Sequence, residues 1–203
     1  IRLSLVGSEM CIRDSSTIDE RIIEDAHKFL QTGQKIELNY PIKNTDRAVG
    51  TKLSSKIYTT FKSRYGSKEW DSNINKDHLN INLTGSAGQS LGAFATKGLK
   101  INLFGDANDY VAKGLSGATI SIRPHKDSTL ISQENTIAGN TVLYGATSGE
   151  LYIAGQAGER FAVRNSGAIT VVEGCGSNGC EYMTGGTVVT VSYTHLTLPT
   201  TPY

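Results

Sequence analysis

The feature that most constrains the fold of this chain is a repeat of short apolar strands between Leu79 and Val189. The strand starts are separated by 20, 19, 17 and 19 residues within two groups, which are Leu79, Leu99 and Ala118, then Leu151, Ala168 and Thr187. The stretch between the two groups holds one extra irregular turn. A period of about 20 residues with one strand per unit is typical of a solenoid, in which each unit buries its apolar face against its neighbours.

Side chains alternate along the predicted strands. Leu79, Ile81 and Leu83 point to one side, while Asn80 and Asn82 point to the other. No helical pattern of about 10 to 15 residues interrupts the strands, which disfavours a doubly wound α/β fold. An antiparallel sandwich is the alternative, but two-residue hairpin turns such as Asn-Gly are scarce. The pattern therefore predicts a single-stranded parallel β-helix.

Glycine is concentrated at the predicted corners. Of the 22 glycines, 18 lie between Gly85 and Gly186, almost all of them between strands. Glycine adopts positive φ readily and lets backbones approach closely. We therefore expect Gly117→Val to cost more stability than Lys126→Ala, because a β-branched residue is penalised at positive φ.

Two helices are predicted before the repeat. Thr17 and Glu20 form a capping box, and Gly33 ends the first helix. The apolar stripe of that helix is Ile18, Ile22, Ala26, Phe29 and Leu30. A strand is expected over Lys35–Tyr40 and a second helix over Leu53–Tyr65, which packs through Leu53, Ile57, Phe61 and Tyr65. Such helices cover the exposed strand edge at the end of a solenoid.

The two ends of the chain are interpreted as translated sequencing-adapter DNA. A DNA sequence that encodes Glu9–Asp14 has a reverse complement that encodes Val191–Leu196. We therefore assign residues 1–15 and 190–203 to adapter, which makes the chain a fragment of a longer protein. Residues 16–70 are assigned to a helical cap and linker, and residues 71–189 to the repeat domain.

Charge and cysteine content limit the classes of partner. The segment 16–189 keeps 18 basic and 17 acidic residues, a net charge of +1. This balance argues against a nucleic-acid or membrane partner. No apolar run approaches the roughly 20 residues that span a bilayer. Cys175 and Cys180 are the two cysteines of the segment, which suits a reducing compartment and a cytoplasmic location.

Several motifs are candidates for chemistry, and each has a plainer structural interpretation. Residues 174–179 match G-x-G-x-x-G, but no helical pattern follows, so a corner is preferred to a dinucleotide site. Cys175 and Cys180 lack the four ligands of a zinc site. The acids and amides of residues 105–110 are common turn formers, although paired carboxylates also serve sugar-cleaving enzymes.

The remaining polar residues do not form a recognisable catalytic set. Glu159, Arg160 and Arg164 are expected to form an ion-pair ladder between neighbouring corners, with an anion site as the alternative. His27, His78 and His125 are scattered, and Ser148 does not lie in a nucleophile elbow. We predict no catalytic, cofactor-binding or metal-binding residue in this chain.

Long blocks of the sequence resemble a known family. The blocks are NTDRAVG, GSAGQSLGAF, GDANDYVAKGLSG, GNTVLYGATSGELYIAGQAGERFAVRNSGA and VVEGCGSNGCEYMTGG, within residues 44–186. They resemble the C-terminal domain, of GXGXG type, of the glutamate synthase large subunit. The resemblance implies a right-handed parallel β-helix of about six to seven coils with a helical N-terminal segment, in an all-β fold class.

The resemblance also implies a function. In that family FMN and an iron–sulfur cluster belong to other parts of the large subunit, and the C-terminal domain is regarded as scaffolding. The implied partners are the other domains of the same subunit and an NADPH-oxidising small subunit, in an enzyme that makes glutamate from glutamine and 2-oxoglutarate. The alternatives are a subunit of formylmethanofuran dehydrogenase, a stand-alone β-helix protein and a carbohydrate-active β-helix.

Overall fold

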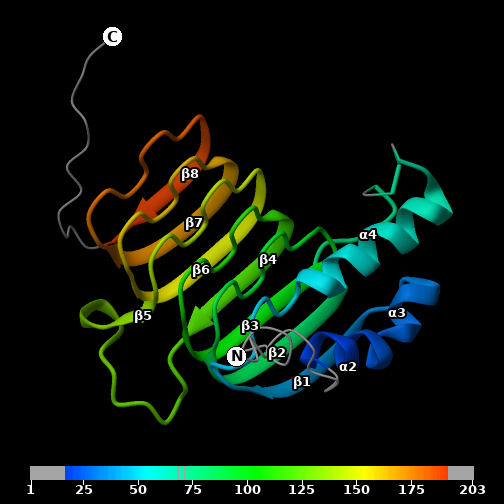
Figure 1. The fold of residues 1–203 in the computed structure, drawn as a ribbon, viewed down its shortest axis with the longest axis horizontal. Coiled ribbons are helices and arrows are strands. Elements are labelled where there is room, and N and C mark those ends of the chain that lie inside the picture. The colour runs from blue at the N-terminus through cyan, green and yellow to red at the C-terminus, as the bar shows by residue number, and fades with distance from the viewer. Residues whose placement is uncertain (1–16, 68, 71, 192–203) are drawn as a thin grey trace, which may run out of the picture.

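One parallel β-sheet organises the protein in the computed structural model, which describes residues 17–67, 69–70 and 72–191 (Figure 1). The strands are β1 (Ile36–Ile42), β2 (Leu79–Ala87), β3 (Leu99–Ala107), β4 (Ser116–Arg123), β5 (Thr136–Ala138), β6 (Ser148–Ala157), β7 (Ser166–Cys175) and β8 (Gly185–Thr190). Their order is β1-β2-β3-β4-β6-β7-β8, and β5 pairs with β3 and β6. All pairings between these strands are parallel.

The predicted fold class, a right-handed parallel β-helix of six to seven coils, is wrong. The strands form a single eight-stranded sheet that does not close, and the segments linking them are turns. In the segment after β3, Tyr110, Ala112 and Gly114 have φ angles of +62°, +55° and +63°. Every second residue thus lies outside the extended region that a β-ladder requires, so only one side of each repeat becomes sheet.

The predicted strand positions are confirmed. Leu79 is the register partner of Leu99, and Ile101 is the register partner of Ile120. The side chains predicted to point inward are buried, namely Leu79, Ile81, Leu83, Leu99, Ile101, Leu103, Ala118, Ile120 and Ile122. Alternation of apolar and polar residues therefore identified the buried face of the sheet correctly.

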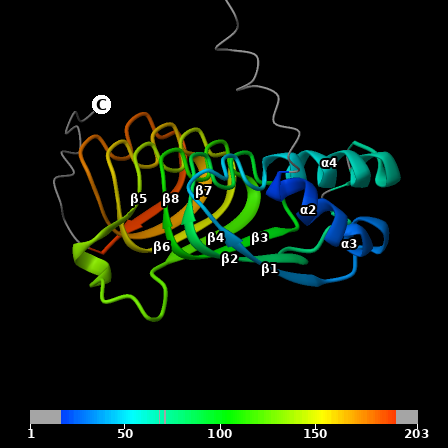
Figure 2. The same cartoon turned by 60° about the horizontal axis from the view of Figure 1, so that its bottom comes forward.

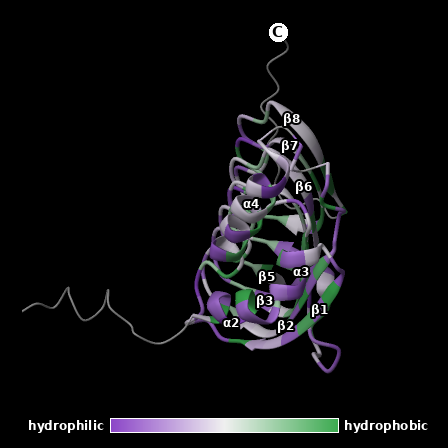
Figure 3. Cartoon of the chain, turned by 90° about the vertical axis from the view of Figure 1, so that its right-hand side faces the viewer, coloured by the Kyte–Doolittle hydropathy of each residue, from purple (hydrophilic) through white to green (hydrophobic). Residues whose placement is uncertain are grey.

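The turns between strands form a second layer (Figure 2). We call residues 88–98, 108–115, 139–147, 158–165 and 176–184 the return segments. Each donates backbone hydrogen bonds to its neighbour. One N–H to carbonyl hydrogen bond of 2.7–2.8 Å recurs at equivalent positions, from Ala112 to Leu91, Leu143 to Val111, Ala162 to Val142 and Cys180 to Phe161. Apolar residues lie between the sheet and this layer (Figure 3), so both layers share one core.

Three helices lie at the β1 end of the sheet (Figure 1): α2 (Ile18–Asp25), α3 (His27–Thr32) and α4 (Thr51–Tyr65). The predicted first helix is interrupted at Ala26, and Gly33 ends it in the left-handed conformation as expected. In α4 the predicted core residues are buried except Tyr65, which is 38% exposed. The helices extend the core beyond the first strands through Ile22, Phe29, Leu53, Ile57 and Phe61.

A buried carboxylate joins two of these helices. Asp19, in α2, accepts hydrogen bonds from the backbone N–H groups of Gly50 at 2.7 Å and Lys52 at 2.9 Å. It thereby caps the N-terminus of α4, whose first N–H groups have no partner within the helix. Burial raises the pKa of Asp19, while the backbone donors act in the opposite direction.

One repeat contains an insertion. The chain leaves the sheet after Arg123 and returns at Thr136, where β5 occupies the place between β3 and β6. The excursion, residues 124–135, includes the short helix η1 (Ser132–Glu134) and projects away from the sheet (Figures 1 and 2). We call it the insert. It accounts for the irregular turn in the sequence pattern.

Two further predictions concern the ends and the membrane. Of the two segments predicted to be adapter-derived, 1–15 and 190–203, all but Thr190 and Val191 lie outside the described residues, and Thr190 is the last residue of β8. Within the described residues, no helix has the length and hydropathy to cross a bilayer.

Candidate functional site

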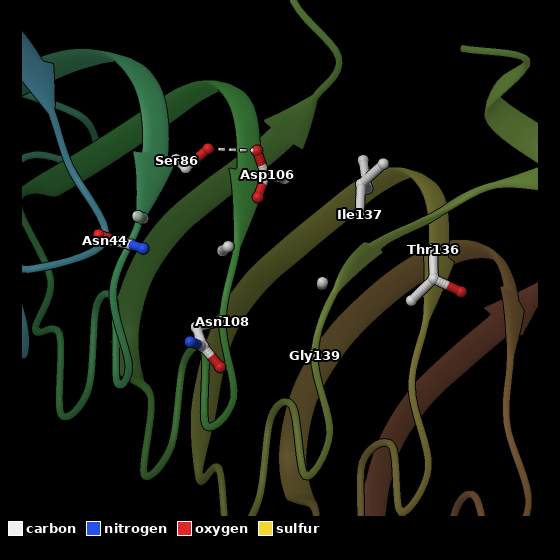
Figure 4. Close-up of a pocket in the computed structure, with 10 residues that line it drawn as sticks. Asn44, Ser86, Asp106, Asn108, Thr136, Ile137 and Gly139 are labelled. Carbon is white, nitrogen blue, oxygen red and sulfur yellow. Dashed lines mark hydrogen bonds between the residues drawn. The ribbon is translucent and has the colours of Figure 1, made fainter.

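The acids and amides that the sequence singled out lie beside a hollow at the ends of β2 and β3 (Figure 4). The hollow measures about 340 Å³ and is lined by residues of β2, β3 and β5. At its rim the Ser86 hydroxyl donates to Asp106 Oδ1 at 2.7 Å. Asp106 is the one carboxylate among the lining residues, so this hollow lacks the acid pair that glycoside cleavage uses.

The neighbouring acid, Asp109, has a structural role. Its Oδ1 accepts a hydrogen bond from the backbone N–H of Asn140 at 2.8 Å. The side-chain oxygen of Asn140 in turn accepts from the backbone N–H of Glu159 at 2.9 Å. Each side chain thus holds the start of the next return segment. The contacts of Asp109 therefore agree with the interpretation of residues 105–110 as turn formers.

The predicted ion-pair ladder at Glu159, Arg160 and Arg164 is wrong. Within the described part of the chain, no ion pair joins Glu159 to either arginine. The contacts between segments come from the backbone instead, because the N–H of Arg160 donates to Ser177 and that of Arg164 donates to Glu181. Both arginines have positive φ, and both side chains are exposed.

The face formed by the return segments has a basic and aromatic hollow of about 480 Å³. It is lined by Tyr110, Lys113, Thr141, Tyr144 and Arg160. The Lys113 ammonium lies 5.6 Å from the centre of the Tyr110 ring, within cation–π range. These groups can bind an anionic or aromatic partner, and they include no general acid or base of the carboxylate or imidazole type.

The outer face of the sheet presents a row of amides across β1 to β4. Asn82 donates to Glu37 at 2.7 Å and to Asn39 at 2.9 Å. Asn102 donates to Asn80 and to Asn82, both at 2.8 Å, and accepts from Ser121 at 2.7 Å. Because the strands are in register, these polar side chains find their hydrogen-bond partners on neighbouring strands. They form a rigid polar surface above a hollow of about 430 Å³.

The described cysteines and histidines form neither a disulfide nor a metal site. Cys175 is buried, and burial raises the pKa of Cys180 to about 11, which disfavours a reactive thiolate. Residues 174–179 lead into a return segment and then β8, so the dinucleotide interpretation is contradicted. Among the described residues, no group of three or more His, Cys, Asp or Glu side chains could hold a metal ion.

A second set of hollows was missed by the sequence analysis. They lie between the insert and the outer face of β2 and β3, and they share Thr84, Phe104, Pro124 and His125. The excess length between Ala118 and Leu151 was the one sequence signal for them. Extra length at one position of a repeat marks a segment that can serve a separate purpose.

Comparison with known proteins gives a consistent result. The family model described as GXGXG motif matches residues 19–198. The glutamate synthase [NADPH] large chain of Azospirillum brasilense is 58% identical over 173 residues, 85% of this chain and 11% of that protein.

Two further relatives are also glutamate synthases. The glutamate synthase [NADPH] large chain of Bacillus subtilis is 47% identical over 176 residues, 87% of this chain and 11% of that protein. The ferredoxin-dependent glutamate synthase 2 of Synechocystis is 45% identical over 184 residues, 91% of this chain and 11% of that protein. The chain therefore spans about a tenth of the length of the relatives it matches.

Proposed function

Because this chain belongs to the GXGXG motif family, we propose that it serves as a rigid, noncatalytic domain of a glutamate synthase large chain. The proposal rests on one observation. Two series of backbone hydrogen bonds, one between the strands and one between the return segments, run along the same hydrophobic core. Strands hydrogen-bond from β1 to β8, and the return segments hydrogen-bond in parallel with them. In a body built in this way each strand is supported chiefly by its neighbours, so the interior strands resist local opening.

The chemistry of the surface supports a scaffold. Each of the five hollows described for this chain holds at most one carboxylate. Carbohydrate cleavage by paired acids therefore lacks its minimum equipment in these hollows. The partners we propose are the other domains of the same large chain and, through them, an NADPH-oxidising subunit. FMN and an iron–sulfur cluster would be held by those other parts.

The proposal is tested by exchange and deletion in a full large chain. The matched 173-residue segment of the Azospirillum brasilense large chain is replaced by the corresponding part of this chain. We expect the chimera to retain glutamine-dependent glutamate formation, because two segments that are 58% identical should share one fold. Deletion of the segment should abolish the activity and lower the melting temperature of the remaining chain.

The isolated chain supplies the control. It should form no glutamate from glutamine and 2-oxoglutarate, with or without FMN and reductant. Turnover by the isolated chain would contradict a noncatalytic role, and full activity after the deletion would contradict the scaffold.

A further inference from the structure

The insert projects beside the outer face of β2 and β3, shares two hollows with that face and is hydrogen-bonded to β6. Gln156, in β6, donates through its side chain to the Gln133 carbonyl at 2.6 Å and through its backbone N–H to the Asn135 carbonyl at 2.9 Å. We call Leu130 and Ile131 the tip of the insert. Leu130 and Ile131 are 48% and 49% exposed, although both are large apolar residues in adjacent positions.

A hollow of about 270 Å³ lies beneath this tip. Its floor contains Gly85 and Gly105, which stack as register partners and carry no side chain to fill the space. Phe104 forms one wall, and Pro124 and Leu130 of the insert contribute another. The Arg123 guanidinium lies 4.4 Å from the centre of the Phe104 ring, which holds that ring in place by a cation–π contact.

One end of the hollow is polar. Ser86 and Asp106 line it there, with the Ser86 hydroxyl bound to Asp106 Oδ1. An adjoining hollow of about 440 Å³ shares the Phe104 wall and adds Arg123 and Lys126. No carboxylate is among the residues that line the adjoining hollow, so its charge is positive.

We propose that this pair of hollows receives a peptide segment of the large chain from outside this domain, anchored by one tryptophan or tyrosine side chain. The inference rests on the proposed function, since about nine tenths of such a chain lies outside the part matched here. The smaller hollow is below the roughly 300–1,000 Å³ of small-molecule sites, which favours a single side chain. Aromatic anchors seated in such pockets dominate interface energies.

The lining determines the chemistry of the occupant. A glycine floor with an aromatic wall accommodates a flat ring, and the Asp106 carboxylate can accept a hydrogen bond from an indole N–H or a phenol O–H. Arg123 and Lys126 in the adjoining hollow favour an acidic residue next to the aromatic one. Leu130 completes the rim, and its exposed face would be covered by the bound segment.

The test compares two neighbouring substitutions. Leu130 lines the smaller hollow, whereas Ile131, with nearly equal exposure, is not among its lining residues. Leu130→Asp places a charge at the rim, and Ile131→Asp places the same charge one residue away. Both variants are made in the isolated chain and in the full-length chimera. Backbone hydrogen exchange of residues 104–106 and 124–135 is measured in each.

We expect exchange in these two segments to be at least tenfold slower in the chimera than in the isolated chain. Leu130→Asp should abolish this protection, Ile131→Asp should retain it, and the melting temperatures of the two isolated variants should agree. Protection that survives Leu130→Asp, or is lost equally in both variants, would overturn the inference.

The remaining outcomes separate this inference from the scaffold proposal. Protection gained elsewhere on the domain, without any beneath the insert, would overturn the inference and leave the scaffold standing. Absence of added protection anywhere on the domain would contradict both. Concentration-dependent protection of the isolated chain beneath the insert would identify a second copy as the occupant and overturn the inference.

Discussion

At Gly105 the fold depends on the absence of a single carbon atom. A Cβ at this position would lie 2.0 Å from the carbonyl oxygen of Gly85 in the neighbouring strand. Gly85 has the same restriction toward Ile42, at 2.3 Å. Successive strands therefore approach closely at this level of the sheet, and the shallow surface they leave becomes the floor of the hollow beneath the insert.

Two glycine substitutions compare this close approach with a position where a Cβ has open space. Gly105 and Gly145 both have positive φ, +152° and +63°, but a Cβ at Gly145 would meet nothing within 4 Å. Gly145→Ala should lower the free energy of unfolding by about 1 kcal/mol through strain alone. Gly105→Ala should cost about 3 kcal/mol or more, because the strands must separate and because an alanine is strained at this φ. Urea denaturation measures both, and equal losses would contradict the close approach.

Non-glycine residues bear much of the unusual backbone conformation. Ala162 at +55°, Leu143 at +61° and Tyr182 at +56° occupy positions where glycine would be easier. Each such residue costs on the order of 1 kcal/mol, and the stacked hydrogen bonds of the return segments compensate for that cost. This conformation therefore belongs to the stack and is not a property of each residue alone.

Elements distant in the sequence are joined by few but specific polar contacts. Asp19 of α2 caps α4, and Lys76 in the loop before β2 pairs with Glu150 of β6. Tyr152 also donates to Glu150 at 3.0 Å. The Glu150 contact ties the loop over residues 66–78 to the middle of the sheet, across the strands that lie between them.

The Glu150 contact predicts a pH dependence. The hydrogen bond from Lys76 lowers the pKa of Glu150, so ionised Glu150 stabilises the folded state above its ordinary pKa of about 4.3. That contribution is lost as the pH falls through the lowered pKa. Because both side chains are partly exposed, Glu150→Gln should cost only about 0.5 kcal/mol at pH 7 and nothing near pH 3.

The control for this measurement is Glu134→Gln, since the Glu134 carboxylate has no ion-pair partner in the described part of the chain. Chemical denaturation from pH 3 to pH 7 measures how the free energy of unfolding of each variant depends on pH. A Glu150→Gln deficit that does not change with pH would show that the charge of Glu150 contributes nothing.

The burial of side chains differs between the strands of the sheet. The interior strand β3 buries Leu99, Ile101 and Leu103 completely, whereas β8 contains no buried residue. The β1 end is covered by the helices, while β8 is the last strand of the sheet order. Stability should therefore decline from the helical end toward β8, because each strand is supported chiefly by its neighbours.

Native-state hydrogen exchange of the isolated chain measures this gradient. Amides of β8 should exchange through local opening, at a free energy well below that of global unfolding, and amides of β3 should require global unfolding. The helix α4 serves as an internal reference at the opposite end. Equal opening free energies for β3 and β8 would show that the domain opens as one unit.

The sequence alone determined the strands, their spacing, their buried face and the family of this chain. Alternation of apolar and polar residues is a local property, so Leu79, Ile81 and Leu83 were assigned correctly without tertiary information. The capped start of the first helix and its end at Gly33 are also local. The long sequence blocks that resemble the glutamate synthase family identified the family.

Tertiary structure alone decided the conformation of the return segments, the hydrogen-bond partners of the polar residues in the turns and the positions of the hollows. The positive φ angles of residues such as Tyr110 and Arg160 arise from hydrogen bonds to neighbouring segments, which no local pattern encodes. For the same reason Asp109 became a support for the next segment. Side chains separated by many residues meet only after the strands stack, so the hollow between Phe104 and Leu130 exists only in the folded chain.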